Sequence, residues 1–350
     1  MYVITARNVH EALPMGLELL KKQGLRRDSR NGDVIVMDSP VTTQYLNPTE
    51  RVLFWPDRDA NPFFHLFESL WMLAGRNDVG YVAHFVKRMK TFSDDGETFH
   101  GAYGYRWRNW FDYDQLAVII KNLKANHSCR RQVLQMWDAK SDLGFAGKDL
   151  PCNTQVYFSI SHDGALDMTV CNRSNDVIWG AYGANAVHFS VLQEYMALSI
   201  GVPVGRYWQM SNNYHAYTTT YDPLQHLADA APDPYRKAPN NPYEIQVMDP
   251  FPLMSSPREQ WDSDLKMFIE EGAVMGLKDP FFRRVAVPML IAYELFKQKD
   301  DAGRYDRAIE HLTQNCQAPD WKMACIEWVQ RRKVKAIQRA QAEDDGVAYE

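Results

Sequence analysis

Side chains able to do chemistry recur between residues 149 and 217, separated by short apolar runs. Cys152 follows a proline there, Arg173 precedes Ser174, and His215 lies near the end of the stretch. A thiolate is the best protein nucleophile near neutral pH, and a nearby cation such as Arg173 lowers the pKa of a cysteine. Because a cysteine is more often a small core residue, its polar neighbours decide the interpretation. They indicate a nucleophilic site that also binds an anion and a polar ring.

Side-chain cations are the expected anion ligands, because the chain has no phosphate loop of the G-x-x-x-x-G-K type. The net charge of −5 also provides no global basic field. A planar guanidinium can bind phosphate through two parallel hydrogen bonds, although adjacent arginines are more often ordinary surface charge. The candidates are Arg30, Arg130, Arg131 and Arg173, together with Ser174.

Glu68 is the only acid in an apolar segment of helical length, residues 63–73. Burying a lone carboxylate is costly unless the group is paired or takes part in chemistry. On the ordinary interpretation, Glu68 lies with His65 and Ser69 on the polar edge of a helix. On the functional interpretation, which its apolar helical neighbours favour, it works at the site.

Hydrophobic periodicity predicts the elements that must position these residues. Residues 100–108 combine glycines with aromatic side chains, which is consistent with backbone passing close to a ligand or with an ordinary tight loop. Residues 222–252, rich in Pro, Asp and Asn, predict a long loop, and the last residues after 342 are expected to fray. Helices are expected at 9–23, 63–73, 78–92, 115–125, 186–200, 260–275, 283–299, 306–314 and 322–342, and strands at 34–37, 132–137, 156–160, 166–171 and 204–210.

Composition bounds the class of protein. The 350 residues are 45% hydrophobic and 24% charged, which is ordinary for one large globular domain or two smaller ones. None of the five cysteines stands in a C-x-x-C pair, so we expect neither a metal site nor disulfides, and a reducing cytoplasmic location. No run is long enough to span a membrane, and no signal peptide is recognisable. The acidic balance argues against nucleic-acid binding through Arg130-Arg131 or residues 331–333.

Ordered motifs from Arg30 to Tyr217 resemble the thymidylate synthase family, including its pyrimidine nucleotide hydroxymethylase branch. Each motif is weak alone, but together and in this order they are specific. The motifs are Arg30-Asn31-Gly32, Val41-Thr42-Thr43, Glu68-Ser69-Leu70-Trp71, Ala102-Tyr103-Gly104, Arg130-Arg131, Pro151-Cys152, Arg173-Ser174-Asn175-Asp176, Gly180 with Asn185, and His215-Ala216-Tyr217.

The resemblance implies a covalent mechanism without a metal. Cys152 would attack C6 of a pyrimidine nucleoside 5′-monophosphate, so that C5 takes the one-carbon unit of 5,10-methylenetetrahydrofolate. Glu68 would organise waters and proton transfers, and Tyr103 would assist removal of the C5 proton. Asn185 would read the base edge and belong to the catalytic group.

The resemblance also implies how the ligands are bound. The phosphate would be held by Arg30, Arg173 and Ser174, while Arg130 and Arg131 would serve the partner's site in a homodimer. The remaining contacts would be His215 and Tyr217 with the sugar hydroxyl, and Asp176 and Gly180 with the pterin ring of the folate.

The implied fold is α/β (α+β), a thymidylate synthase-like fold with a large mixed twisted sheet, packed helices and a homodimer formed through the sheet. Residues 1–255 would form the catalytic domain, and residues 256–350 a helical C-terminal elaboration of the same domain. No nucleic acid and no membrane are expected as partners.

Departures from the family pattern bear on the product. Asn153 follows the nucleophile where the synthases typically carry histidine, and no apolar tail that would close over the folate is recognisable at the C-terminus. Delivery of hydride requires that water be kept out, so both changes favour hydroxymethylation over methylation by a thymidylate synthase reaction. The amide of Asn185 can match uracil in one orientation and cytosine in the other. We rank dUMP slightly ahead of dCMP, with CMP third.

One further hypothesis comes from another class, a catalytically silent relative that binds nucleotide or serves as a dimer scaffold. The joint presence of Cys152, Glu68 and Asp176 argues against it.

Overall fold

Two sheets organise the fold in the computed structural model of the chain, which describes residues 1–232, 241–245, 248–299 and 301–344. The larger sheet has the strand order β1-β4-β9-β7-β6-β5, and the smaller has the order β2-β3-β10-β8. The strands are β1 (Tyr2–Ala6), β2 (Leu25–Arg27), β3 (Val34–Val36), β4 (Val41–Tyr45), β5 (Val133–Gln135), β6 (Asn153–Ile160), β7 (Leu166–Asn172), β8 (Asn175–Asp176), β9 (Val204–Ser211) and β10 (Tyr214–Tyr217).

The larger sheet is mixed, as expected. The β1–β4 and β7–β9 pairs are parallel, whereas β4–β9, β6–β7 and β5–β6 are antiparallel. The predicted hairpin of β6 and β7 is confirmed, with Phe158 paired with Met168. Two strands of the smaller sheet follow directly on strands of the larger one, because β8 comes after β7 and β10 comes after β9.

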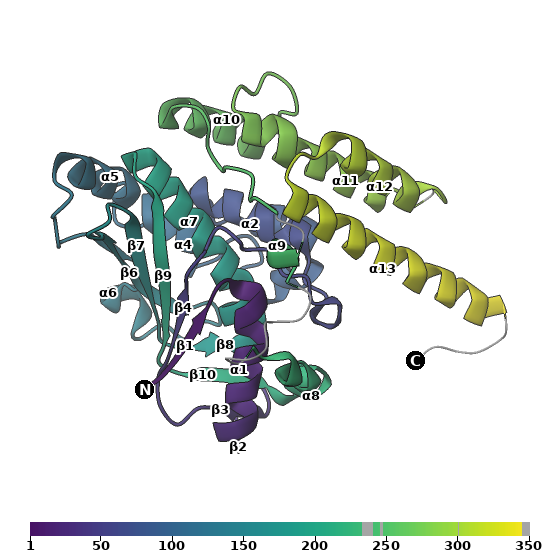
Figure 1. Cartoon of the computed structure of the whole chain (residues 1–350), viewed down its shortest axis with the longest axis horizontal. Helices are drawn as coiled ribbons and strands as arrows, with labels where there is room; N and C mark the ends of the chain where they lie inside the picture. Colours follow the sequence, from purple (N-terminus) through teal and green to yellow (C-terminus); the bar gives the residue numbers. More distant parts are fainter. Residues whose placement is uncertain (233–240, 246–247, 300, 345–350) are drawn as a thin grey trace.

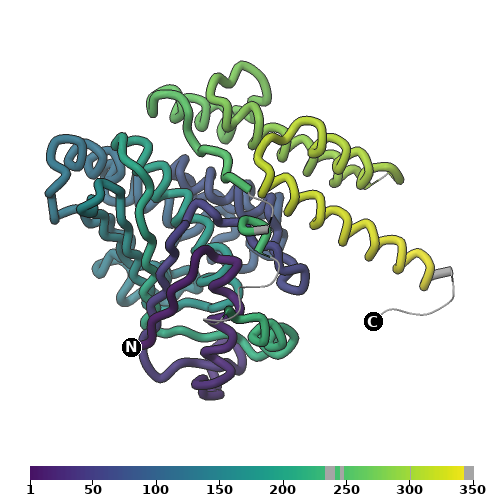
Figure 2. Tube along the Cα trace, viewed as in Figure 1, coloured from purple at the N-terminus to yellow at the C-terminus, as the bar shows by residue number. Residues whose placement is uncertain are grey.

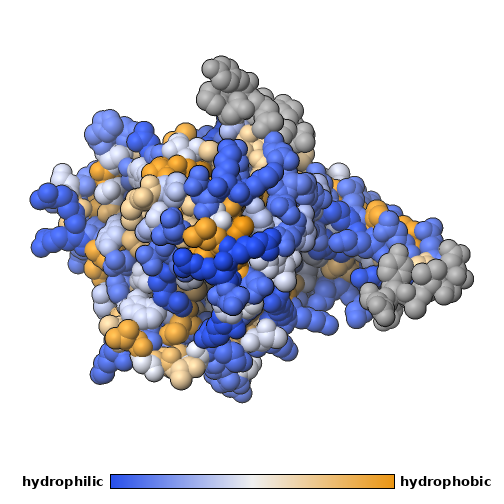
Figure 3. All heavy atoms as spheres, turned by 90° about the horizontal axis from the view of Figure 1, so that it is seen from below, coloured by the Kyte–Doolittle hydropathy of each residue, from blue (hydrophilic) through white to orange (hydrophobic). Residues whose placement is uncertain are grey.

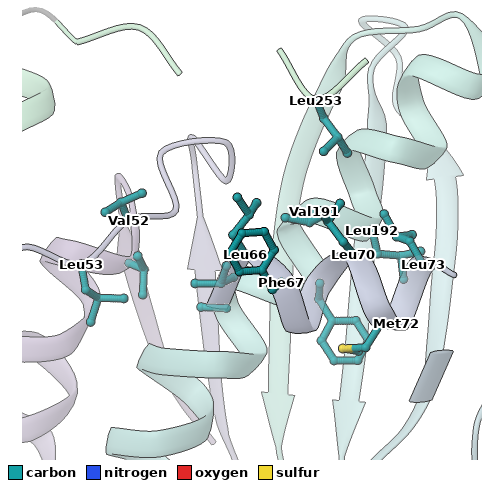
Figure 4. Close-up of a cluster of buried hydrophobic side chains, with 14 of the residues drawn as sticks. Val52, Leu53, Leu66, Phe67, Leu70, Met72, Leu73, Val191, Leu192 and Leu253 are labelled. Atoms are coloured by element: carbon teal, nitrogen blue, oxygen red, sulfur yellow. The ribbon is translucent and has the colours of Figure 1, made fainter. Parts of the chain in front are cut away.

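Three helices supply much of the core beside the sheet: α1 (Val9–Gln23), α2 (Pro62–Leu73) and α7 (Asn185–Ile200). The apolar side chains of α2 and α7 pack together, as the cluster in Figure 4 shows for Leu66, Leu70 and Val191. The helix α7 is buried along almost its whole length, including polar side chains such as His188 and Gln193. Gly201 ends α7 with φ of 93°, a left-handed conformation that favours glycine.

A short helix, α4 (Tyr103–Arg108), packs directly on α2. A Cβ atom added to Gly104 would lie 2.0 Å from the carbonyl oxygen of Met72. The glycine therefore allows two helix backbones to approach each other. The expected ligand-side loop at residues 100–108 is replaced over most of its length by this helix.

Several boundaries differ from the sequence prediction. Residues 78–92 do not form one helix, because the extended backbone of Val86 (φ −137°) separates α3 (Val79–Phe85) from a 3-10 turn. The expected long loop at 222–252 is partly helical where it is described, and its residues 233–240 and 246–247 lie outside the described residues. The remaining helices in the first 255 residues are α5 (Gln115–Ala125), α6 (Ala139–Asp142), α8 (Thr218–Leu224) and α9 (Pro242–Ile245).

The last part of the chain forms the predicted helical region. It comprises α10 (Arg258–Glu270), α11 (Val287–Lys297), α12 (Arg304–Asn315) and α13 (Pro319–Asp344), which extends away from the body in Figures 1 and 2. The ring of Phe63 on α2 packs against Tyr293 of α11 and Trp328 of α13. The expected frayed end reaches into residues 345–350, which lie outside the described residues.

Alternate side chains of the larger sheet lie exposed on one face. Val3 is 66% exposed, Val133 is 43% exposed and Tyr157 is 40% exposed, although all three are apolar or aromatic. The face of the molecule in Figure 3 is largely hydrophilic with small apolar patches. Of the helices in the described ranges, none combines the length and apolar character needed to cross a bilayer.

Candidate active site

Cys152 lies immediately before β6, with its thiol beside the guanidinium of Arg173. The Nη2 group of Arg173 donates to Cys152 Sγ at 3.7 Å, and its Nε group donates to the carbonyl oxygen of Pro151 at 2.9 Å. The backbone N–H of Arg173 also donates to the carbonyl oxygen of Cys152 at 2.9 Å. The start of β6 and the end of β7 therefore hold the predicted nucleophile and its predicted cation together.

Opposing influences act on the Cys152 thiol. Burial raises its pKa above the ordinary value, the Arg173 charge lowers it, and the Asp149 carboxylate raises it. Asp149 is itself fixed by the backbone N–H of Gly101, which donates to Oδ2 at 2.8 Å. Asp149 is the first residue of the stretch that contains the predicted site, but the sequence analysis predicted no function for it.

Tyr103 contacts the same turn from the start of α4. The backbone N–H groups of Cys152 and Asn153 donate to its hydroxyl oxygen at 3.2 and 3.3 Å. Burial raises the pKa of Tyr103, so the phenol is neutral near pH 7. Since both contacts are donors to the oxygen, the hydroxyl proton is left for a ligand or a water.

Glu68 projects from α2 toward α7. Its Oε2 atom lies 3.1 Å from Nε2 of His188, at ion-pair distance but without hydrogen-bond alignment. The His188 ring also packs edge-on against His65. The acid is therefore only 12% exposed in its side chain and has a titratable partner, which the sequence interpretation did not single out. The helical spacing of Asn185 and His188 could have suggested it.

Asp176 and His215 face each other across the parallel β8–β10 pair. Asp176 Oδ1 accepts the backbone N–H groups of Ile178 and Trp179 at 2.9 and 2.6 Å, whereas the buried Oδ2 atom has no partner among the described residues. Burial raises the pKa of Asp176, and the His215 and Arg58 charges oppose that rise. An unpaired carboxylate oxygen fits the N–H groups of a pterin ring.

Arg58 is a further cation at this end of the site, and the sequence interpretation missed it. Its Nε group donates to the carbonyl oxygen of Ile178 at 2.9 Å, and its guanidinium lies 4.5 Å from the ring centroid of Trp179. Burial lowers its pKa to about 10, so it stays charged at neutral pH. The single arginine in an irregular stretch gave no periodic signal.

Tyr217 and His215 lie on one side of β10, with their rings 5.5 Å apart. The Nδ2 group of Asn31 donates to the hydroxyl of Tyr217 at 3.4 Å. This contact ties the loop of Arg30 to β10, and Arg30 itself is exposed.

The other residues predicted for the site make fewer contacts with Cys152 and Arg173. Ser174 follows Arg173 in the turn between β7 and β8. Arg130 and Arg131 are exposed before β5, and within the described ranges no hydrogen bond or ion pair links either one to Cys152 or Arg173. Within one chain, Arg130 and Arg131 therefore make no direct polar contact with the nucleophile Cys152.

Asn185 begins α7 and contacts amides from two strands. Its Oδ1 atom accepts from Asn153 Nδ2 at 3.2 Å, and its Nδ2 group donates to Asn175 Oδ1 at 3.0 Å. Gly180 lies beneath the second of these bonds, since a Cβ atom there would be 2.6 Å from Asn175 Oδ1. In the described part of the chain, no group of three or more His, Cys, Asp or Glu side chains could hold a metal ion. The five cysteines are free thiols.

Comparisons with known proteins place this geometry in context. The family model described as Thymidylate synthase matches residues 59–248. The chain is 57% identical to a deoxyuridylate hydroxymethyltransferase of Pseudomonas phage M6 over 352 residues, which cover 100% of both chains. It is 41% identical to a protein of the same name from Bacillus phage SP01, over 52% of this chain and 50% of the relative. A thymidylate synthase of Streptococcus pyogenes serotype M5 (strain Manfredo) is 27% identical over 57% of this chain and 68% of the relative.

Proposed function

The chain belongs to the thymidylate synthase family, and from that premise we propose that it hydroxymethylates C5 of dUMP with 5,10-methylenetetrahydrofolate as co-substrate. The observation that carries the proposal is the similarity over the whole chain to a relative named deoxyuridylate hydroxymethyltransferase. The relatives named thymidylate synthase are more distant, at 27% identity. The folate supplies the one-carbon unit.

Cys152 is the nucleophile that adds to C6 of the pyrimidine. The Arg173 guanidinium favours its thiolate, and addition makes C5 nucleophilic toward the one-carbon unit. Tyr103 assists loss of the C5 proton by positioning a water that takes it, because its hydroxyl is fixed beside Cys152 and can donate its hydrogen to that water. Loss of that proton expels tetrahydrofolate and leaves an exocyclic methylene group at C5. Water adds to this group, and the thiolate of Cys152 is released.

Glu68 binds and activates the water that adds to the methylene group. Its carboxylate is nearly buried, with Oε2 against His188, so a water bound by the carboxylate could lose a proton to it. Asn153 replaces the histidine that the synthases typically carry beside the nucleophile, at the point where hydride delivery would require a dry site. These features support hydroxymethylation over reduction to a methyl group.

Ligand binding is divided among the remaining residues. Arg30, Arg173 and Ser174 hold the phosphate, and His215 and Tyr217 contact the sugar hydroxyl. Asp176 and Gly180 contact the folate, and the unpaired Oδ2 atom of Asp176 supports that role. Asn185 reads the base.

The active form is a homodimer that pairs the exposed faces of the larger sheets. The exposed apolar and aromatic side chains at Val3, Val133 and Tyr157 support this assembly. Arg130 and Arg131 lie beside the same sheet and would complete the phosphate site of the partner. Residues 256–350 belong to the same domain as the catalytic part, because Tyr293 and Trp328 pack on α2.

Product analysis tests the reaction. The protein is incubated with methylenetetrahydrofolate and, in separate tubes, dUMP, dCMP, UMP or CMP, and the products are examined by mass spectrometry. We expect a hydroxymethyl product from dUMP. A methyl product accompanied by dihydrofolate would identify a thymidylate synthase instead, and a protein that binds dUMP but releases no C5 proton would be a silent relative.

A further inference from the structure

Five amide side chains form a continuous hydrogen-bonded row at the site, which we call the amide row. Each NH₂ group donates to the amide oxygen of the next member, so all four bonds run in one direction. All members except the half-buried Asn185 are at most 3% exposed. In order of donation the members are Asn172, Asn153, Asn185, Asn175 and Gln209.

The far end of the row fixes its direction. Gln209 Nε2 donates to the carbonyl oxygen of Ala181 at 3.4 Å and to the hydroxyl of Tyr207 at 2.9 Å. A backbone carbonyl can only accept. If the row were reversed, Gln209 Oε1 would face the Ala181 oxygen, and a buried acceptor pair without a proton is unfavourable. Every amide upstream of Gln209 is oriented by this anchor.

Two neighbours support the middle of the row. Ser211 Oγ accepts a second bond from Asn175 Nδ2 at 2.9 Å. A Cβ atom at Gly180 would lie 2.6 Å from Asn175 Oδ1 and 3.0 Å from Asn185 Nδ2. The glycine therefore leaves the space that the bond between these two amides occupies.

We propose that the amide row fixes the orientation of the Asn185 amide and thereby selects uracil over cytosine, an inference that rests on the proposed function. Uracil offers a donor at N3 and an acceptor at O4, whereas cytosine offers an acceptor at N3 and a donor at its 4-amino group. One amide orientation matches only one of these patterns. Turning Asn185 over would place Nδ2 against Asn153 Nδ2 and Oδ1 against Asn175 Oδ1, which breaks two bonds. Asn175 and Gln209 are thus positioning residues for base choice.

Asn175 offers a matched pair of variants. In Asn175→Asp, the side chain still presents an acceptor to Asn185 Nδ2 whether it is ionised or protonated. In Asn175→Leu, the shape is similar but the acceptor is lost. The dissociation constants of dUMP and dCMP are measured by calorimetry, which needs no turnover, and kcat/KM is measured for both nucleotides.

We expect the preference for dUMP to persist in Asn175→Asp and to fall about tenfold or more in Asn175→Leu, the effect of one lost buried hydrogen bond. A loss of affinity for both nucleotides with an unchanged ratio would overturn the inference. So would a wild-type protein that binds dUMP and dCMP equally. Thermal melting of each variant identifies any that do not fold.

A second pair keeps the test decisive if a variant at Asn175 does not fold. Gln209→Glu retains an acceptor for Asn175 Nδ2, whereas Gln209→Leu removes it. The ratio should be kept in the first and lowered in the second, and equal ratios in both would contradict the proposal. Selective binding of dUMP without product formation would refute the proposed reaction and leave the amide row supported.

Discussion

Cys152 lies between a cation and an anion whose effects on its thiol oppose each other. Arg173 lowers its pKa and Asp149 raises it, within a buried setting that raises it further. We expect the rate of alkylation by iodoacetamide to rise with pH as the thiolate forms. The midpoint should move to higher pH in Arg173→Ala and to lower pH in Asp149→Asn. Movement of both midpoints in the same direction would contradict this assignment of charges.

Glu68 is expected to matter for chemistry more than for folding. Glu68→Gln keeps the shape of the side chain but cannot exchange a proton with water, so formation of the 5-hydroxymethyl product from dUMP should fall about 10²–10⁴-fold. The melting temperature should stay near that of the wild type. His188→Gln is the companion variant, because it changes the group 3.1 Å from the acid while leaving the carboxylate in place. Unchanged formation of the hydroxymethyl product in Glu68→Gln would remove the acid from the mechanism.

The contact between α2 and α4 positions Tyr103, and it depends on Gly104. In Gly104→Ala the new methyl group would meet the backbone of Met72, so we expect a loss of stability of about 1–3 kcal/mol in denaturant unfolding. Activity should fall as well, because Tyr103 precedes Gly104. The control is Gly80→Ala in α3, where a Cβ atom meets nothing within 4 Å and a helical alanine should stabilise by about 0.5–1 kcal/mol. Equal stabilities for the two variants would show that the close approach does not matter.

The sequence predicted those helices and strands that have a clear hydrophobic periodicity. The apolar spacing of residues 9–23 and 186–200 predicts α1 and α7 closely, and the resemblance correctly predicts the mixed sheet. The amide row could not be predicted from the sequence, because it depends on the register in which the strands pair. Asn153 faces Asn172 across β6–β7, and Asn172 faces Ser211 across β7–β9. No local pattern relates residues from strands so far apart along the chain.

The homodimer is the prediction that belongs to the whole molecule, and complementation between inactive variants tests it. One protein carries Arg130→Ala with Arg131→Ala, and the other carries Cys152→Ala. If the arginines serve the partner's site, mixed dimers contain one complete site, and an equal mixture should recover about a quarter of wild-type activity. Absence of recovery in dimers that exchange subunits would show that each chain uses its own arginines. Tyr157→Asp, on the exposed face of the sheet, should weaken the dimer in sedimentation experiments.

The residues that the sequence predicts for the candidate site lie together in the structure only in part. Cys152, Arg173 and Tyr103 do meet in the structure, whereas Arg130 and Arg131 make no hydrogen bond or ion pair with Cys152 or Arg173 in the described residues. Their proposed role needs a second chain, which no analysis of one chain's periodicity can supply. Arg58 was missed because it lies in a short irregular stretch between two aspartates, and His188 because it lies in a helix whose sequence indicates mainly packing.

The origin of the oxygen in the product tests the central claim most directly. The protein is supplied with dUMP and methylenetetrahydrofolate in water enriched in ¹⁸O, and the nucleotide product is analysed by mass spectrometry. Water addition predicts a 5-hydroxymethyl nucleotide that carries ¹⁸O in its new hydroxyl group, formed by the wild type and not by Cys152→Ala. An unlabelled methyl product together with dihydrofolate would contradict the account, because it would show that hydride and not water reaches the exocyclic carbon.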